Sequence, residues 1–180
     1  MQRVLFPAVG ALVVVLSSCG PVAPPGAAGA HGSPGRAAED GSIAGDGRIS
    51  PYADHVAIRR MDPGLLAAVR EAAEDARAAG IEVGVTSGWR SAEYQQRLLD
   101  EAVARYGSVE EARRFVTTPE ESAHVSGKAV DIGPTDAADW VGRHGAAYGL
   151  CQVYANEMWH FELLTTPGGR CPEQRGDAAG

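Results

Sequence analysis

The spacing of apolar residues divides the chain into regions of different character. Apolar side chains fill most positions from Val4 to Leu16, whereas Gly, Pro, Ala and Ser dominate residues 20–48. Further along, apolar residues recur every two or every three to four positions, which is the spacing of strands and helices. We therefore expect one folded domain at residues 49–175, a disordered tether at 20–48 and a disordered tail at 176–180.

Two long helices are predicted from their start and stop signals. Asp62 is a candidate cap, Pro63 suits the first helical position and Gly80 ends the helix. The apolar stripe of this helix contains Leu65, Leu66, Val69 and Ala73. Ser91 is the candidate cap of the second helix, whose predicted apolar face contains Tyr94, Leu98 and Ala102.

Two shorter helices are expected further along the chain. Ser108 is followed three residues later by Glu111, which is the pattern of a capping box, and residues 117–119 close that helix. Thr135 is the candidate cap of a helix that continues towards residue 149.

Four apolar segments predict strands. They are residues 81–88, in which Ile81, Val83 and Val85 share one face, and residues 128–133, 150–154 and 159–164. Because the helices come early and most of the strands come late, the order predicts an α+β domain with a small antiparallel sheet flanked by helices.

The first nineteen residues have the features of an export signal. Arg3 precedes the apolar run, which is too short to cross a bilayer comfortably but suits the apolar part of a secretory signal. The run ends in Leu-Ser-Ser-Cys, which resembles a bacterial lipobox, so cleavage would leave Cys19 as a lipid-modified first residue. We expect an exported lipoprotein, held at the cell membrane through Cys19 and facing the cell wall. A plain signal peptide that is cut further along and discards Cys19 remains the alternative.

Length and charge narrow the function classes. The chain has 180 residues, enough for one compact domain, and a formal net charge of −7. This charge argues against a protein that grips nucleic acid through a basic face. We expect a monomer with no nucleic-acid partner.

Two pairs of polar residues suggest a metal site. His124 lies seven residues before Asp131, and Gly127 between them can form a turn that brings the two side chains together. His160 lies three residues after Glu157. A catalytic zinc ion usually has three protein ligands and a nearby carboxylate that accepts a proton from its bound water. His124, Asp131 and His160 are therefore candidate ligands, and Glu157 is the candidate base.

The second pair also restricts the local structure. Residues three apart in a regular strand face opposite sides, so Glu157 and His160 converge only if Glu157 belongs to the preceding loop. Taken alone, a histidine before a glycine turn, or an isolated Glu-x-x-His, is also common at structural and surface positions. These residues by themselves leave both a metal site and a structural role open.

Three motifs in the domain resemble those of one enzyme family. SAHVSGKAVDI at residues 122–132 matches the Ser-x-His-x-x-Gly-x-Ala-x-Asp signature of the bacterial zinc D-alanyl-D-alanine carboxypeptidases of the VanY type. EMWHFE at 157–162 is similar to their Glu-x-Trp-His segment. SGWRS at 87–91 is similar to their Ser-Gly-Tyr-Arg-Ser, with Tyr94 and Gln95 at the expected places after it.

The resemblance implies a hedgehog-like α+β fold that binds one zinc ion per chain through His124, Asp131 and His160. It implies that Glu157 is the general base and that Arg90 stabilises the oxyanion or holds the substrate. Ser122 and Gln95 are further candidate substrate contacts. Two positions depart from the family pattern: Trp89 stands where tyrosine is usual, and Met158 stands where proline is frequent. Both positions supply bulk or rigidity and not chemistry, so we expect activity to survive.

The implied activity is removal of the terminal D-alanine from peptidoglycan stem peptides at the cell surface. The same fold and site also serve D-Ala-D-Ala dipeptidases, L,D-carboxypeptidases and peptidoglycan endopeptidases, which the sequence does not separate. A non-catalytic cell-wall-binding module is the alternative from outside the enzymes. The presence of Glu157 argues against such a module, because a purely structural zinc site needs no free base.

The cysteines suggest a covalent link. If Cys19 carries lipid, Cys151 and Cys171 remain as a pair in an exported, oxidising setting. The loop between them contains Glu157 and His160, so we predict a disulfide that ties the end of the chain across the active-site strand. Two free thiols or extra metal ligands are the alternatives.

Overall fold

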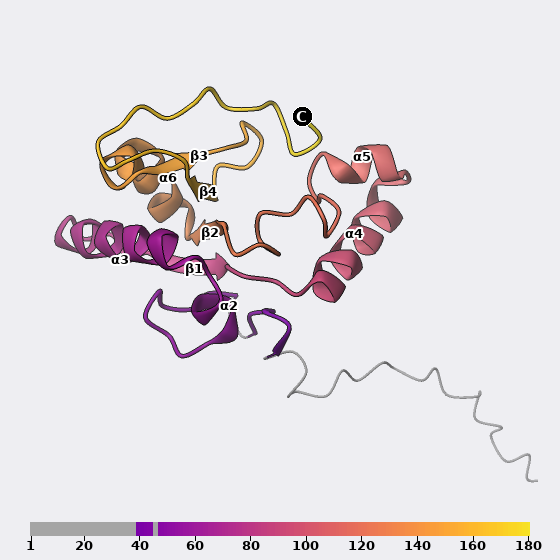
Figure 1. Cartoon of the computed structure of the whole chain (residues 1–180), viewed down its shortest axis with the longest axis horizontal. Helices are drawn as coiled ribbons and strands as arrows, with labels where there is room; N and C mark the ends of the chain where they lie inside the picture. The colour runs from indigo at the N-terminus through magenta and orange to yellow at the C-terminus, as the bar shows by residue number, and fades with distance from the viewer. Residues whose placement is uncertain (1–38, 45–46) are drawn as a thin grey trace, which may run out of the picture. The chain divides into compact units, whose positions relative to one another are not determined.

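A computed structural model describes residues 39–44 and 47–180 (Figure 1). The predicted export signal, Cys19 and most of the predicted tether lie outside the described residues. Within the described part of the chain, no helix is long and apolar enough to cross a membrane.

Short segments of regular structure alternate along the domain. The helices are α2 (Val56–Arg59), α3 (Pro63–Ala78), α4 (Ala92–Tyr106), α5 (Val109–Arg113) and α6 (Thr135–His144), followed by the 3₁₀ helix η1 (Gly145–Tyr148). The strands are β1 (Gly84–Ser87), β2 (Ala129–Gly133), β3 (Leu150–Gln152) and β4 (His160–Leu163). The strands form one antiparallel sheet in the order β1-β2-β4-β3. The predicted α+β class with a small antiparallel sheet is therefore confirmed.

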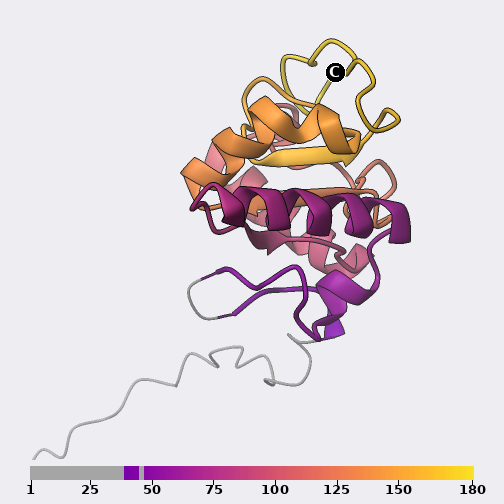
Figure 2. The ribbon, with the colours of Figure 1, turned by 90° about the vertical axis from the view of Figure 1, so that its left-hand side faces the viewer.

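Helices α3 and α6 lie against one face of this sheet (Figure 2). The main core lies between them and the strands, and its fully buried members include Leu65, Val69, Val130, Val141 and Phe161. Helices α4 and α5 pack against each other and form a second, smaller apolar cluster of Leu99, Ala102 and Ala112. The domain thus has a core on one face of the sheet and a separate helical pair, α4–α5.

The predicted caps are largely confirmed. The Asp62 carboxylate accepts hydrogen bonds from the backbone N–H groups of Gly64 and Leu65 at the start of α3. At the start of α4 the Ser91 hydroxyl accepts from the backbone N–H of Tyr94. At the start of α5 the Ser108 hydroxyl accepts from the backbone N–H of Glu111. Side-chain caps of this kind satisfy N–H groups that have no partner inside the helix.

Two local predictions are wrong. Thr135 is the first residue of α6 and not its cap; Pro134 occupies the cap position, and no side chain caps this helix. The buried residues of α4 are Gln95, Leu99 and Ala102, whereas Tyr94 and Leu98 are only partly buried. An apolar pattern could not identify this face, because the most buried position on it is a glutamine.

The strands are shorter than predicted at their outer ends. The segment expected at residues 81–88 is a strand only over Gly84–Ser87, although Val83 and Val85 are buried as expected. The pairing of β1 with β2 shifts between Val85 and Ser87, so Thr86 is an extra residue in β1. Such a bulge bends the strand at the point where it leads towards Arg90.

Candidate metal centre

Three segments of the fold bring the predicted ligands together. His124 lies in the loop between α5 and β2, Asp131 lies in β2, and His160 is the first residue of β4. Asp131 and His160 are direct partners in the antiparallel pair of β2 and β4. Gly127 has a φ of +74° and forms the turn expected before β2. This conformation strains residues that carry a Cβ, and a Cβ at Gly127 would also lie 2.6 Å from the carbonyl oxygen of Arg60.

The three ligand atoms form a nearly equilateral triangle. His124 Nε2 lies 3.3 Å from His160 Nδ1. Asp131 Oδ1 lies 3.2 Å from each of these nitrogens. Two atoms that each lie about 2.0–2.1 Å from a tetrahedral zinc ion are about 3.3 Å apart. His124, Asp131 and His160 therefore fit a tetrahedral zinc ion with one position left open. In the described part of the chain, their ligand atoms lie close enough together to hold a metal ion.

Each of the two candidate histidine ligands is oriented by a second contact. The other ring nitrogen of His124, Nδ1, lies 2.8 Å from the Gly88 carbonyl oxygen, so His124 donates its N–H there and presents Nε2 to the site. His160 Nε2 lies 3.2 Å from the Glu162 carboxylate, which leaves Nδ1 for the metal. Such outer contacts fix the tautomer of a ligating histidine and its ring orientation. The sequence motifs pointed to neither Gly88 nor Glu162 in these roles.

Burial and neighbouring charges shift the pKa values of the three candidate ligands. Burial alone would raise the pKa of Asp131, but the attraction of His124, His160 and Arg90 holds it well below its usual range. Burial lowers the pKa of His124. For His160, the hydrogen bonds to Asp131 and Glu162 outweigh burial and raise the pKa to about 9. The polar surroundings of His160 thus favour a positive charge at this position, which a metal ion would also supply.

Glu157 lies beside the ligands and not among them. It belongs to the loop that precedes β4, as the alternation along a strand requires, and its carboxylate oxygen lies 3.8 Å from His160 Nδ1. Burial raises the pKa of Glu157 to about 7, with a further contribution from the nearby charge of Asp131. A buried carboxylate with a pKa close to neutrality is suited to accept and return a proton.

Arg90 joins the metal site to the helical pair. Its Nη2 donates to Asp131 Oδ2 at 2.9 Å, so Asp131 uses one oxygen for the ligand triangle and the other for this ion pair. Its Nε donates to the Ser87 hydroxyl at 2.7 Å and its Nη1 to Gln95 Oε1 at 3.1 Å. Gln95 is almost fully buried, and its own amide donates to the Thr117 carbonyl oxygen at 2.9 Å. The glutamine thus holds Arg90 against Asp131 and ties α4 to the loop before His124.

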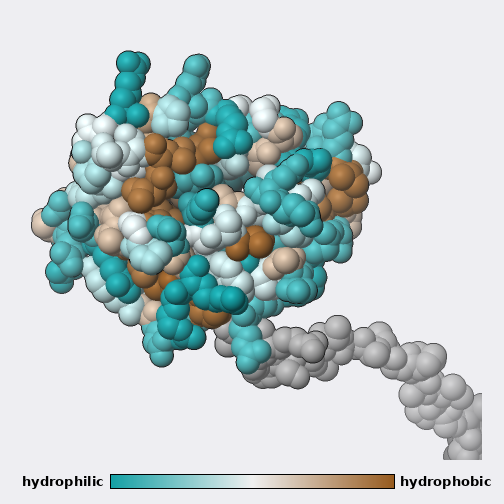
Figure 3. All heavy atoms as spheres, viewed as in Figure 1, coloured by the Kyte–Doolittle hydropathy of each residue, from teal (hydrophilic) through white to brown (hydrophobic). Residues whose placement is uncertain are grey.

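A cleft of about 470 Å³ opens above these residues. Its polar floor consists of Arg90, Ser122, His124, Asp131, Glu157 and His160, and its walls include Leu98, Tyr106, Phe115, Tyr154 and Trp159. Tyr106 and Phe115 stack with ring centroids 4.7 Å apart. The surface view shows small apolar patches separated by hydrophilic side chains on one face of the molecule (Figure 3). The cleft combines convergent polar groups with partly apolar walls, as ligand sites commonly do.

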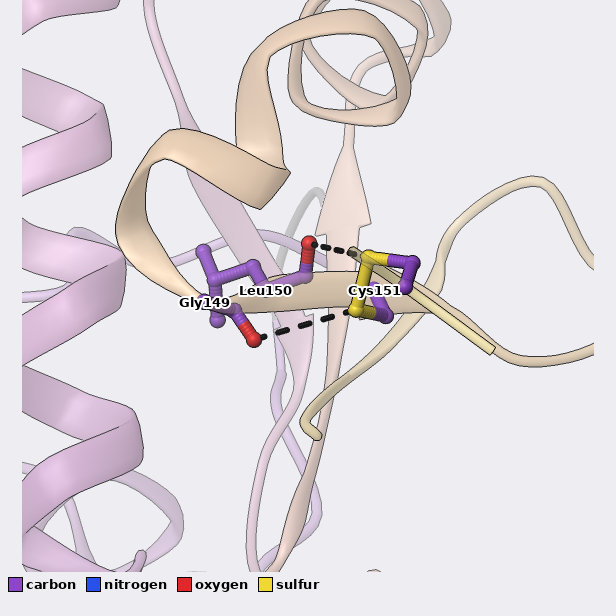
Figure 4. The surroundings of a disulfide bond; sticks show 4 residues. Gly149, Leu150 and Cys151 are labelled. Carbon is purple, nitrogen blue, oxygen red and sulfur yellow. Dashed lines mark hydrogen bonds between the residues drawn. A yellow bond between two sulfur atoms is a disulfide. The ribbon is translucent and has the colours of Figure 1, made fainter. Parts of the chain in front are cut away.

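The predicted disulfide is present. Cys151 in β3 is bonded to Cys171, with their Cα atoms 5.6 Å apart (Figure 4). Cys151 is buried, and its strand pairs with β4, which begins at His160. The bond therefore fixes the segment that follows β4 to the strand beside the metal site.

Comparisons with known proteins give the family of this chain. The family model of the VanY D-alanyl-D-alanine carboxypeptidases matches residues 58–165. A D-alanyl-D-alanine carboxypeptidase of Enterococcus faecalis is 28% identical over 144 residues, which cover 66% of this chain and 48% of that protein. The chain thus spans about half the length of this curated relative.

Solved structures show the same fold. VanYB in complex with D-alanine-D-alanine has a TM-score of 0.55 and 26% identity, covering 58% of this chain and 72% of that one. A mutant of a vancomycin resistance D,D-pentapeptidase VanY in complex with Zn(II) has a TM-score of 0.54 and 27% identity, covering 57% and 71%. The vancomycin resistance D,D-dipeptidase VanXYg has a TM-score of 0.52 and 25% identity, covering 64% and 55%. The predicted fold of the D-Ala-D-Ala peptidase type is confirmed.

Proposed function

The chain belongs to the VanY family of D-alanyl-D-alanine carboxypeptidases, and on that premise we propose that it is a zinc-dependent D,D-carboxypeptidase. Its proposed substrate is a peptidoglycan stem peptide, from which it removes the terminal D-alanine. One observation carries the proposal. The ligand atoms of His124, Asp131 and His160 form a triangle with edges of 3.2–3.3 Å, and the carboxylate of Glu157 lies beside it.

Glu157 is the proposed general base. A zinc ion bound by His124, Asp131 and His160 would polarise the scissile carbonyl and make a water molecule more acidic. The Glu157 carboxylate would accept a proton from the attacking water and later return it to the leaving amine. A carboxyl group with a pKa of about 7 can carry out both transfers near neutral pH. Positive charge at the ligand site would lower that pKa and favour the ionised, proton-accepting form.

Arg90 has two proposed roles. Through Nη2 it holds the oxygen of Asp131 that does not face the other ligands. A guanidinium group has five N–H donors, and the described contacts of Arg90 use three of its nitrogens once each. The remaining N–H groups can donate into the cleft, either to the developing oxyanion or to the terminal carboxylate of the peptide.

Ser122 and Gln95 differ as candidate substrate contacts. Ser122 borders the cleft two residues before His124 and is 5% exposed, and its hydroxyl remains a proposed contact. Gln95 is 1% exposed, and its amide already bonds Arg90 and Thr117. Its contribution to substrate binding is therefore proposed to act through Arg90.

The export features complete the proposal. A peptidoglycan substrate requires the domain to lie outside the cytoplasm, which agrees with the apolar N-terminal run and with the lipobox at Cys19. We propose a monomeric lipoprotein at the cell membrane that binds one zinc ion per chain. The disulfide between Cys151 and Cys171 agrees with an oxidising location.

Related cut positions are the second candidate, because the structural relatives include a D,D-dipeptidase. Incubation with a stem pentapeptide that ends in D-Ala-D-Ala distinguishes them. Release of free D-alanine supports the proposal, and release of the dipeptide or an internal fragment reassigns the activity. A chain that binds zinc and peptide but releases nothing is a binding module.

A further inference from the structure

The segment that follows β4 pairs with the loop that carries Glu157. We refer to residues 153–159, between β3 and β4, as the base loop, and to residues 171–178 as the strap. Arg175 N donates to the Val153 carbonyl oxygen, and Ala155 N donates to the Arg175 carbonyl oxygen, both at 2.9 Å. These bonds pair Tyr154 with Arg175 in a parallel bridge. The Arg175 guanidinium also lies 5.1 Å from the centroid of the Tyr154 ring.

Arg114 joins the base loop and the strap to helix α5. It is the C-terminal cap residue of α5, and the last carbonyl groups of a helix have no partner within the helix. The Arg114 carbonyl oxygen accepts from Asn156 Nδ2 at 3.1 Å and from Ala178 N at 3.2 Å. Its Nε donates to the Asp177 carboxylate at 2.8 Å. Strap, base loop and α5 therefore meet at one residue.

These contacts converge on the turn that presents Glu157. Glu157 N donates to the Tyr154 carbonyl oxygen at 3.3 Å, and His160 N donates to the Glu157 carbonyl oxygen at 3.2 Å. The strap holds the backbone on either side of Tyr154, and the Asn156 side chain is tied to Arg114. The sheet holds the start of the base loop, because Val153 N donates to the His160 carbonyl oxygen at 3.4 Å and Gln152 Nε2 donates to the Tyr154 carbonyl oxygen at 2.9 Å. The strap and Arg114 hold the next two residues, Ala155 and Asn156, which immediately precede Glu157.

We propose that Asn156, Arg114 and the strap form a clamp that positions Glu157 for proton transfer. The inference rests on the proposed function, in which Glu157 is the general base. The Arg114–Asp177 ion pair is too exposed to stabilise the clamp much by itself, with side-chain exposures of 49% and 18%. The clamp depends instead on the backbone bonds of the strap and on the Asn156 amide. Its effect on rate arises because a displacement of about 1 Å can slow a positioned reaction by about 10²-fold.

Two variants test the clamp. Asn156→Asp keeps the size of the side chain but removes the Nδ2 donor to Arg114. A chain that ends at Pro172 removes most of the strap and keeps the disulfide. We expect each to bind zinc like the wild type and to lose kcat by about 10-fold or more on a D-Ala-D-Ala stem pentapeptide, with KM within about 2-fold. Gln96→Ala, which removes an exposed amide hydrogen bond on α4, is the matched control and should keep kcat.

The same variants in a Glu157→Gln background show whether the clamp acts through the base. If it does, Asn156→Asp should cause no further loss of kcat once the carboxylate is gone, because residues that act as a unit are not additive. An equal loss in both backgrounds, or an unchanged kcat for both variants, overturns the proposal.

Hydrogen exchange gives a readout that needs no turnover. In the zinc-free protein, the amides of Ala155 and Glu157 should exchange faster in Asn156→Asp than in the wild type, while amides of α3 keep their rates. Equal rates at the base loop would also overturn the proposal. If the shortened chain does not fold, kcat and hydrogen exchange are both measured on Asn156→Asp. If the wild type releases no D-alanine, the proposed function fails, and the exchange experiment still decides whether the clamp exists.

Discussion

Replacing Glu157 with glutamine separates its chemical role from its structural one. The substitution keeps the size of the side chain and leaves the ligand triangle intact, because the carboxylate lies 3.8 Å from the nearest ligand nitrogen. Zinc content should therefore stay at the wild-type value. Turnover should fall by about 10²- to 10⁴-fold, the usual effect of losing a positioned acid–base group. Metal analysis and D-alanine release on the same preparation measure both quantities.

The same variant should change stability in a pH-dependent way. In the zinc-free protein, burial raises the pKa of Glu157 from 4.5 to about 7. A carboxyl group whose pKa is raised by folding stabilises the fold at low pH and loses that contribution as the pH rises from 4.5 through 7. The difference corresponds to about 3 kcal/mol at most, and the lost attraction to protonated His160 reduces the benefit of the substitution. Glu157→Gln should thus raise the unfolding free energy at pH 8 by about 1–3 kcal/mol, with little effect at pH 4.

Denaturant unfolding of the wild type and Glu157→Gln in the presence of a chelator measures this difference in stability. An unchanged pH dependence of stability would show that the carboxylate is solvated and not buried in the protein.

The activity and zinc content of Glu157→Gln test its chemical role. Retained activity would remove Glu157 from the mechanism, whereas loss of zinc would make it a ligand and change the role of Asp131.

Further predictions concern the ligands and their supports. His124→Ala should abolish stoichiometric zinc binding, and a variant that keeps one zinc ion per chain contradicts the ligand set. Arg90→Lys should weaken zinc affinity by about 10- to 100-fold, because a single lysine nitrogen replaces the three guanidinium nitrogens that contact Ser87, Gln95 and Asp131. Unchanged affinity in a zinc competition titration refutes this role. Replacing both Cys151 and Cys171 with serine should lower the unfolding free energy by about 3 kcal/mol, since the bond closes a loop with a sequence separation of 20. An unchanged denaturation midpoint would show that the bond adds no stability.

Local sequence rules identified the elements whose signals lie close together in the chain. The caps at Asp62, Ser91 and Ser108 each involve a side chain and a backbone N–H two or three residues away, so their residue types suffice to predict them. The turn at Gly127 is equally local. The predicted cap at Thr135 is wrong, because a hydroxyl residue near the start of a helix can be either the cap or the first helical residue, and Thr135 is the latter.

The remaining features depend on contacts that the sequence does not encode locally. Glu162 orients His160 because both side chains project from β4 with one residue between them, but the motif alone does not reveal which ring nitrogen is left for the metal. Gln95 is buried because Arg90 and Thr117 arrive beside it from other elements. The bonds from Arg114 to Asn156 and Asp177 join positions separated by 42 and 63 residues. Such contacts follow from tertiary packing, and no periodicity marks them.

The pairing of β2 with β4 explains how residues from motifs far apart in the sequence come to lie at a defined distance from each other. In β2 and β4, Val130 faces Phe161, and both are completely buried in the main core. The next pair along the ladder is Asp131 and His160, whose side chains project from the opposite face towards the cleft. A slip of one residue would place the charged pair in the core and the apolar pair in the cleft, which makes the slipped register strongly unfavourable. The apolar side of the sheet therefore fixes the register, and the register fixes the distance between Asp131 and His160, two of the three candidate metal ligands.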